Sequence, residues 1–237
     1  MTCIKSIADR ANLSNQAFRK AALLPDHKIY NLNGIERFFP QRVNSMKRLK
    51  FLYDSFKGFE CDIQFDQDTK TFFIGHDGLE NDPQLQEFLE WDKERKIFWL
   101  DLKNLSVDTA AFSAALKRLD AKFAIRNRVI IESINRQIVQ KASEEGYFAS
   151  YYLPNNLKND TVQKELANFC RSGSSDIASF SEDIIFTDAI RSFCPEKKQI
   201  TWDSNFWHSL NRKVLLKNVN DSSILVCLLN IKSPGYR

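Results

Sequence analysis

The chain has 237 residues, of which 43% are hydrophobic and 27% are charged, with seven glycines and six prolines. This length suffices for one large domain or two small ones, and the composition excludes a collagen, a low-complexity disordered chain and a small disulfide scaffold. The formal net charge of +4 arises from 34 basic and 30 acidic residues. Such mild basicity favours anionic ligands, but the basic residues form no stripe, so we expect no nucleic-acid partner.

The cysteines and the apolar runs bear on the cellular compartment. The five cysteines are scattered and include no C-x-x-C pair, which argues against a zinc knuckle or a redox motif. Met1–Lys20 lacks the apolar core of a signal peptide, and the longest apolar runs, such as Ile224–Leu229, are too short to span a bilayer. We therefore expect a cytoplasmic protein with reduced thiols and no transmembrane segment.

Short apolar runs of strand length alternate with stretches of helical periodicity along the chain. The expected strands are Lys28–Leu32, Phe59–Phe65, the short hairpin strand Thr71–Gly75, Ile97–Leu102, Arg128–Glu132, Tyr147–Leu153, Asp176–Phe180, Gln199–Trp202 and Ile224–Leu229. The expected helices contain Met46–Phe56, Leu85–Leu89, Ala111–Leu119, Ile134–Ala142, Val162–Phe169 and Phe206–Val214.

This alternation predicts an α/β fold with a single (β/α)8 TIM-type barrel over residues 25–237. Residues 1–24 are predicted to form an extra N-terminal helix, a helical extension of the barrel. A doubly wound open sheet is the alternative. That fold normally carries a glycine-rich turn after its first strand, whereas Asn33-Gly34 offers a single glycine there.

Polar residues lie at the ends of the predicted strands, where barrels of this kind carry their sites. On the second strand Glu60 and Asp62 are two residues apart and therefore share one face. Two carboxylates this close repel each other unless they share a cation or a proton, and a hard divalent ion would relieve the repulsion. A half-exposed strand with solvated acids is the alternative, and the spacing alone does not decide between the two.

The next strand and the preceding loop add three candidates. Asp101 would be a third metal ligand, and Lys103, two residues further on, would meet a ligand phosphate as a point charge. An internal ion pair of these two residues is the alternative. His76 stands between Gly75 and Gly78, which allow a tight turn that exposes the ring. Its ordinary pKa lies near neutrality and suits proton transfer, although a histidine of a surface loop is the plainer interpretation.

Four segments occur in order along the chain: Asn44-Ser45, Gly58–Ile63 (GFECDI), Gly75–Asp77 (GHD) and Leu100–Lys103 (LDLK). The series resembles the glycerophosphodiester phosphodiesterase-like family, within the phosphatidylinositol-phospholipase-C-like TIM-barrel superfamily. The similarity is strongest over residues 28–103. Weaker matches to the family's fourth strand and late tryptophan strand follow at Ile130–Ser133 and Thr201–Asn205.

The resemblance implies a metal-dependent hydrolase of a glycerophosphodiester or a related sugar or lipid head-group phosphodiester. Glu60, Asp62 and, in some branches, Asp101 would hold a divalent cation, Mg²⁺ or Ca²⁺. The ion and Lys103 would neutralise the non-bridging phosphate oxygens as charge grows in the transition state. Two histidines would act as acid and base, and one of them matches His76.

The second histidine is where the chain departs from the resemblance. The family carries it at the end of the first strand, and there we expect Asn31, which exchanges no proton at neutral pH. The arginine that often follows is also missing there, so Arg37 or Arg42 would supply its charge. Losing one member of an acid–base pair costs about 10²–10⁴ in rate. Two predictions stay open: a phosphodiesterase that uses His76 alone, and a barrel that binds a phosphorylated ligand without turnover.

Two further residues are candidates for binding the substrate. Glu132 ends the fourth strand, where it would contact the head group of a ligand. Trp202 would form an apolar wall for a glycerol, sugar or acyl portion of that ligand. The alternative for both residues is that they only fill the protein core. An unrelated barrel, such as a metal-dependent aldolase or a sugar hydrolase, remains a third possibility. Glycosidases place their two acids about 5–10 Å apart, usually on different strands, unlike Glu60 and Asp62.

Overall fold

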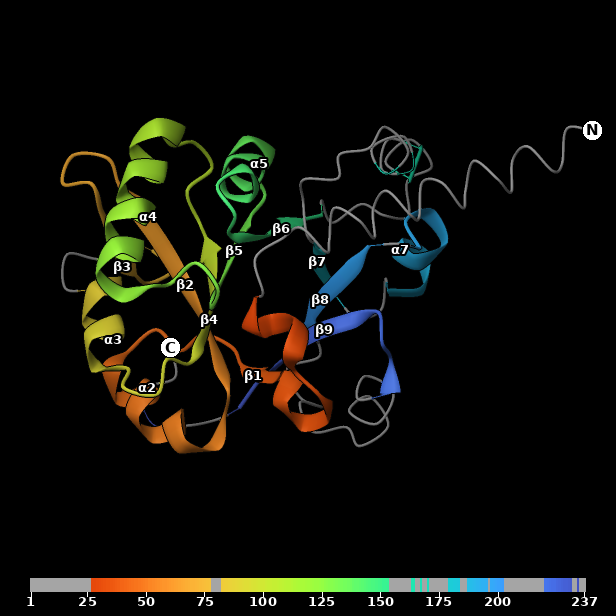
Figure 1. The fold of residues 1–237 in the computed structure, drawn as a ribbon, viewed down its shortest axis with the longest axis horizontal. Helices are drawn as coiled ribbons and strands as arrows, with labels where there is room; N and C mark the ends of the chain where they lie inside the picture. The colour runs from red at the N-terminus through yellow and green to blue at the C-terminus, as the bar shows by residue number, and fades with distance from the viewer. Residues whose placement is uncertain are drawn as a thin grey trace, which may run out of the picture.

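Eight parallel strands and one antiparallel hairpin strand form a single curled sheet in the described part of the chain (Figure 1). The strands are β1 (Phe38–Pro40), β2 (Gly58–Asp66), β3 (Thr71–Ile74), β4 (Ile97–Leu102), β5 (Val129–Ser133), β6 (Phe148–Tyr152), β7 (Ser179–Asp183), β8 (Lys198–Trp202) and β9 (Ile224–Leu229). Their order in the sheet is β1-β9-β8-β7-β6-β5-β4-β2-β3. The mixed α/β class and the barrel-like curl agree with the sequence prediction.

The computed structural model describes residues 27–77, 82–153, 163–164, 167, 170, 179–183, 187–195, 197–202, 220–231 and 234. The predicted N-terminal helix (residues 1–24) and the predicted helix Phe206–Val214 lie outside these residues, as does most of Val162–Phe169. No helix among the described residues is long and apolar enough to cross a membrane.

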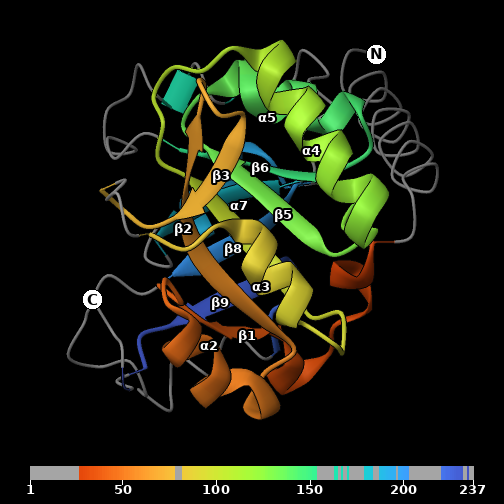
Figure 2. The same cartoon turned by 90° about the vertical axis from the view of Figure 1, so that its left-hand side faces the viewer.

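The described helices lie on the outer side of the sheet, and Figure 2 shows α3 and α4 in front of the strands around β5. They are α2 (Met46–Leu52), α3 (Leu85–Trp91), α4 (Thr109–Phe123), α5 (Arg136–Glu144) and α7 (Thr187–Phe193). The described residues also form the 3₁₀ helices η1 (Lys28–Asn31), η2 (Gly34–Arg37) and η3 (Tyr53–Ser55). Side chains cap several of them: Asp108 accepts hydrogen bonds from two backbone N–H groups at the start of α4, and Asn135 accepts one at the start of α5.

The first predicted strand is wrong. Lys28–Leu32 forms the 3₁₀ helix η1 and its following residue, and the first strand is the three-residue Phe38–Pro40. In η1 the Ile29 side chain is buried while Tyr30 and Asn31 are exposed, as expected of a helical turn resting on the protein by one side. The real strand escapes pattern analysis because it is very short and ends in proline, which cannot donate to a ladder.

Two apolar clusters lie on opposite faces of the sheet. The larger joins the outer face of the sheet to α2–α5. The smaller occupies the inside of the curl and consists of Ile29, Phe39, Ile97, Trp99, Ile130, Phe148, Ile200, Val226 and Leu228. Because side chains alternate along each strand, the later inward-facing positions of β2, β4 and β5 are left for polar residues. We call the end of the sheet where these strands finish the mouth.

The curled sheet closes where β1, at one end of the sheet, comes next to β2, near its other end. The backbone N–H of Val43, just after β1, donates to the Glu60 carbonyl at 2.8 Å. At the start of β2, Gly58 leaves space for the Phe39 ring, and a β-carbon at residue 58 would overlap that ring. Glycine is therefore required here by the close approach of a buried aromatic side chain.

The expectation of reduced thiols is wrong for one pair of cysteines. Cys170 and Cys194 form a disulfide that links a residue of the β6–β7 connection to the residue after α7. Cys61 and Cys227 are buried and take part in no disulfide. Burial, with the negative charges of Glu60 and Asp62 adding to it, raises the pKa of the Cys61 thiol well above its usual value, so this cysteine is an inert core residue.

Substitution of Gly58 tests the contact that closes the sheet. We expect Gly58→Ala to lower the free energy of unfolding by roughly 1–3 kcal/mol, as overpacked cores do, because its methyl group overlaps the Phe39 ring. Urea unfolding measures the loss. Adding Phe39→Leu to the Gly58→Ala chain should restore part of it, since the shorter side chain leaves room. Strictly additive effects of the two changes would contradict this account.

Candidate active site

Three carboxyl groups from two neighbouring strands meet at the mouth. Glu60 and Asp62 share the inward face of β2, and the β2–β4 register pairs Asp62 with Asp101. One carboxylate oxygen from each of the three lies within 4.8 Å of the others. Glu60 and Asp62 are 4% and 2% exposed, and Asp101 is half-buried. The half-exposed strand considered from the sequence is therefore excluded, and the three predicted ligands do converge.

Burial of these groups makes their charges costly. Desolvation raises the pKa of Glu60 well above its usual value, and the charges of Asp62 and Asp101 raise it further. The backbone N–H of Arg42, which donates to Glu60 Oε2, opposes that rise. Desolvation also raises the pKa of Asp101, although Lys103 acts in the opposite direction. The cluster thus gathers several carboxyl groups whose negative charges the neighbouring donors and Lys103 compensate only in part.

Among the described residues, the ammonium group that touches the acids is that of Lys103. Its Nζ lies 2.7 Å from Asp62 Oδ1 and 2.5 Å from Asp101 Oδ2. Burial alone would lower the pKa of Lys103, but the two carboxylates outweigh it and hold that pKa above its usual value. One ammonium against three carboxyl groups leaves negative charge to be balanced. The donor set of three carboxylates at this spacing fits a hard divalent cation such as Mg²⁺ or Ca²⁺.

Asn44 fixes the central carboxylate. Its Nδ2 donates to Asp62 Oδ2 at 2.6 Å, and its Oδ1 accepts from the Asp62 backbone N–H at 3.0 Å. The neighbouring Ser45 caps α2 by accepting from the Arg48 backbone N–H. The sequence analysis noticed Asn44-Ser45 as a motif but assigned it no role. These two hydrogen bonds fix the orientation of the Asp62 carboxylate, which could serve as a metal ligand.

His76 lies on the loop that follows β3, at the same end of the sheet as the acids. The backbone N–H of the preceding Gly75 donates to the Asp62 carbonyl at 2.9 Å. The imidazole is 60% exposed, and its Nδ1 lies 2.7 Å from Asp77 Oδ1. The charge of His76 acts to lower the pKa of Asp101. His76 therefore lies near enough for its charge to act on Asp101, and its role in the site stays a prediction.

Glu132 occupies the inward position of β5 next to Asp101, its register partner. It is 2% exposed, and its Oε2 accepts from Trp99 Nε1 at 2.5 Å. Desolvation raises the pKa of Glu132 well above its usual value, and Asp101 adds to this, while hydrogen bonds from the Ser181 hydroxyl and Trp99 oppose it. The predicted binding residue Glu132 is thus buried beside the acids.

The two remaining predicted binding residues lie at opposite ends of the sheet. Trp202 ends β8 at the mouth and stacks on Tyr152, with ring centroids 5.1 Å apart and an interplanar angle of 19°. Arg37 instead donates from Nη1 to the carbonyls of Asp221 and Ile224, at 2.9 and 3.1 Å. Because Ile224 begins β9, Arg37 lies at the amino-terminal end of the strands, away from the acids.

Solved structures match this chain, although no protein-family model and no curated protein sequence does. A proposed glycerophosphodiester phosphodiesterase from Galdieria sulphuraria superposes with a TM-score of 0.62 and 13% identity, covering 84% of this chain and 94% of its own. An Oleispira antarctica phosphodiesterase, in complex with the product sn-glycerol-3-phosphate, gives 0.57 and 14%, covering 87% and 94%. A glycerophosphodiester phosphodiesterase from Parabacteroides distasonis gives 0.57 and 10%, covering 83% and 94%.

This chain has the glycerophosphodiester phosphodiesterase fold. The structural likeness confirms, at the level of the fold, the resemblance drawn from the four sequence segments. Within the glycerophosphodiester phosphodiesterase fold, the residues that follow the first strand at the mouth are Gln41 and Arg42. Sequence analysis missed Gln41 because it placed that strand too early in the chain.

Asn31 does not stand at the end of the first strand, as expected. It lies in η1, whose first residue, Lys28, donates its backbone N–H to Asn127 at 2.9 Å, just before β5. This 3₁₀ helix is therefore at the amino-terminal end of the strands in the phosphodiesterase fold, opposite the acids. Gln41 occupies the position at the end of the first strand where we expected Asn31. Like asparagine, glutamine has an amide side chain that exchanges no proton at neutral pH.

The buried carboxyl group of Glu132 predicts a pH-dependent stability. The pKa of Glu132 is higher in the folded state than in the unfolded chain, so this carboxyl group contributes to the free energy of unfolding. The contribution is complete below the pKa of the unfolded state and is lost as the pH rises through the pKa of the folded state. Glutamine stays neutral and keeps an acceptor for Trp99. We therefore expect the free energy of unfolding of Glu132→Gln, relative to wild type, to be higher at about pH 8 than at about pH 4.

Urea unfolding at the two pH values measures this difference. The exposed Glu144, on the outer side of α5, provides the matched control, because Glu144→Gln removes the same charge from a solvated position. Equal pH dependence of the two variants relative to wild type would contradict the assignment of Glu132 as a group that the fold holds neutral.

Proposed function

We propose that this chain is a metal-dependent hydrolase of phosphodiesters, acting on a glycerophosphodiester or a related sugar or lipid head-group ester. The observation that carries the proposal is the convergence of the three carboxyl groups of Glu60, Asp62 and Asp101 with Lys103 at one mouth. A cation site next to a fixed ammonium is the arrangement that neutralises the two non-bridging oxygens of a phosphodiester. The fold shared with the phosphodiesterases named above supports the same chemistry.

The residues would divide the work as follows. Glu60, Asp62 and Asp101 would hold Mg²⁺ or Ca²⁺, which supplies Lewis-acid stabilisation of phosphate charge when bound. Lys103 binds a non-bridging oxygen directly, and its two carboxylate partners keep it protonated. Asn44 acts as a positioning residue, because its two hydrogen bonds hold Asp62 in the orientation that the site needs.

Proton transfer falls to His76. The contact between its Nδ1 and Asp77 orients the ring and leaves Nε2 to give a proton to, or take one from, an oxygen of the ester. The other histidine of the described residues, His27, is buried against Phe148 away from the mouth. His76 therefore works with a substrate hydroxyl or a water molecule as its partner. Glu132 and Trp202 line the same end for the alcohol portion of the substrate.

A second candidate function is a barrel that binds a phosphorylated ligand without turnover. Gln41 favours it, because an amide follows β1 where the family resemblance calls for a histidine. Loss of that proton donor leaves the acids and Lys103 in place, so binding of phosphate does not depend on it. Hydrolysis measured directly separates the two candidates.

Hydrolysis of bis(p-nitrophenyl) phosphate tests the proposal. With Mg²⁺ or Ca²⁺ we expect p-nitrophenol release that EDTA abolishes, and His76→Ala should lower kcat by about 10²–10⁴ because it removes the acid–base group. Asp68→Asn, an acid on the exposed β2–β3 turn, is the matched control and should keep the wild-type rate.

Two results would overturn the proposal. One is no hydrolysis with either metal, and the other is activity that survives both EDTA and His76→Ala. If the wild type is inactive but calorimetry detects sn-glycerol-3-phosphate binding in the presence of Ca²⁺, the binding function replaces the enzymatic one. In that case Gln41→His should create hydrolysis, since it restores an imidazole at the end of β1.

A further inference from the structure

A second polar cavity lies on the outer side of the sheet, apart from the mouth. It has a volume of about 300 Å³ and is bounded by the β2–β3 turn, the start of α3 and one side of α4. Figure 1 shows these three elements side by side at one flank of the molecule. None of the residues that line it belongs to the acid cluster, Lys103 or His76. We call this cavity the outer groove.

The outer groove is lined by three cationic side chains and by no carboxylate. The cations are Lys70, on the turn, and Arg118 and Lys122, one helical turn apart on α4. The guanidinium of Arg118 donates from Nη2 to the Lys70 carbonyl at 2.9 Å, which fixes the two residues beside each other. A guanidinium has five N–H donors, so a single carbonyl leaves donors for an anion.

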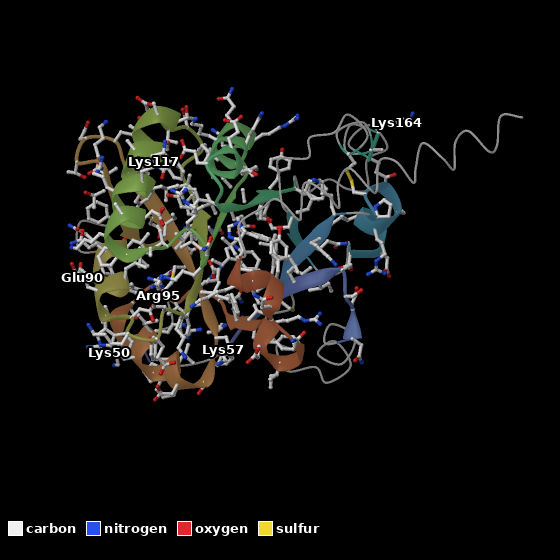
Figure 3. All side chains as sticks on the ribbon, viewed as in Figure 1. Lys50, Lys57, Glu90, Arg95, Lys117 and Lys164 are labelled. Atoms are coloured by element: carbon white, nitrogen blue, oxygen red, sulfur yellow. A yellow bond between two sulfur atoms is a disulfide. The ribbon has the colours of Figure 1, made fainter. Side chains whose placement is uncertain are left out.

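Three acids lie close to the groove without lining it. Backbone hydrogen bonds, with the charge of Lys70 adding to them, lower the pKa of Asp66 and of Asp108, and the third acid is Glu90. Glu90, on the outward side of α3 in Figure 3, pairs with Lys122 at 2.8 Å and accepts from Gln86 Nε2 at 2.9 Å. Both partners are about half exposed, and exposed pairs of this kind contribute little energy. Glu90 therefore offsets Lys122, and Asp66 and Asp108 act on Lys70. Among the described residues, Arg118 is the lining cation for which no acid partner is found.

The floor of the outer groove is apolar. Phe72 and Leu85 are 3% and 1% exposed, Ala115 is 2% exposed, and Leu119 packs against the same core cluster. Thr69 and Thr71 also line the groove, and their hydroxyls donate hydrogen bonds to Asp66 Oδ2 and to the Thr69 carbonyl. An apolar floor under a cationic rim matches a molecule with a ring or short aliphatic part and one anionic group. The volume is at the lower end of the range for small-molecule sites.

We propose that the outer groove binds a small amphipathic anion, an aryl or alkyl phosphate monoester, with the phosphate at Arg118 and Lys70. The apolar portion lies on Phe72 and Leu119. This site is separate from the one proposed for the phosphodiester, and it stands whether or not the mouth is catalytic.

Calorimetric titration with phenyl phosphate at low ionic strength tests the proposal. Arg118→Gln should weaken binding about tenfold or more, because it removes a charge-assisted contact. Lys117→Gln is the matched control, because it makes the same charge change at the preceding residue of α4. Lys117 pairs with Glu145 on the α5 side and does not line the groove. This control should keep the wild-type affinity.

Three outcomes would contradict the proposal. The first is no binding of phenyl phosphate to the wild type. The second is equal weakening by Arg118→Gln and Lys117→Gln, which would indicate a diffuse charge effect. The third is binding that survives Arg118→Gln but is lost in Lys103→Met, which would place the ligand at the mouth. The ligand's source is tested with vesicles of phosphatidylcholine containing phosphatidic acid: binding to vesicles but not to free phenyl phosphate also contradicts the assignment to a small soluble ligand.

Discussion

Repulsion among three carboxyl groups on two neighbouring strands is the constraint that shapes the mouth of this barrel. The β2–β4 register sets Asp62 beside Asp101, and the two-residue strand period sets Glu60 on the same face. Polar contacts around the acids relieve part of that repulsion: the Lys103 ammonium bridges two of the acids, and the Arg42 backbone N–H binds the third. A buried cluster of this kind has little value for stability alone, because desolvation of charge costs energy that a close ion pair only partly returns.

Apolar packing elsewhere in the fold offsets the free-energy cost of burying these acids. The larger apolar core lies between the outer face of the sheet and its helices, so most of the buried apolar side chains lie outside the curl. Inside the curl, the floor is apolar and includes Phe39, Trp99 and Phe148. Polar residues follow toward the mouth, where Ser179 donates to Ser150 at 2.8 Å and Glu132 is held by Trp99. The sheet thus separates the larger apolar core on its outer face from the buried carboxyl groups on its inner face.

Sequence patterns predicted the parts of the site that strand periodicity determines. Glu60, Asp62 and Asp101 lie in or at the end of long apolar runs, so both their strands and their shared face follow from local spacing. The first strand did not follow, because three residues ending in proline carry no periodic signal. That error displaced the expected mouth residue from Gln41 to Asn31 and put Arg37 at the wrong end of the sheet. The contact of Asn44 with Asp62 and the Cys170–Cys194 disulfide depend on tertiary packing, which no local pattern encodes.

The central claim is that the acids at the mouth form one cation site, and Mn²⁺ binding measured by electron paramagnetic resonance tests it most directly. The account predicts a single bound ion per chain. It also predicts about 10–100-fold weaker binding in Asn44→Ala, which frees the Asp62 carboxylate, and loss of binding in Asp62→Asn. Asp68→Asn should bind as the wild type does. A wild-type chain that binds no Mn²⁺, or an Asp62→Asn chain that binds it equally well, would contradict the account.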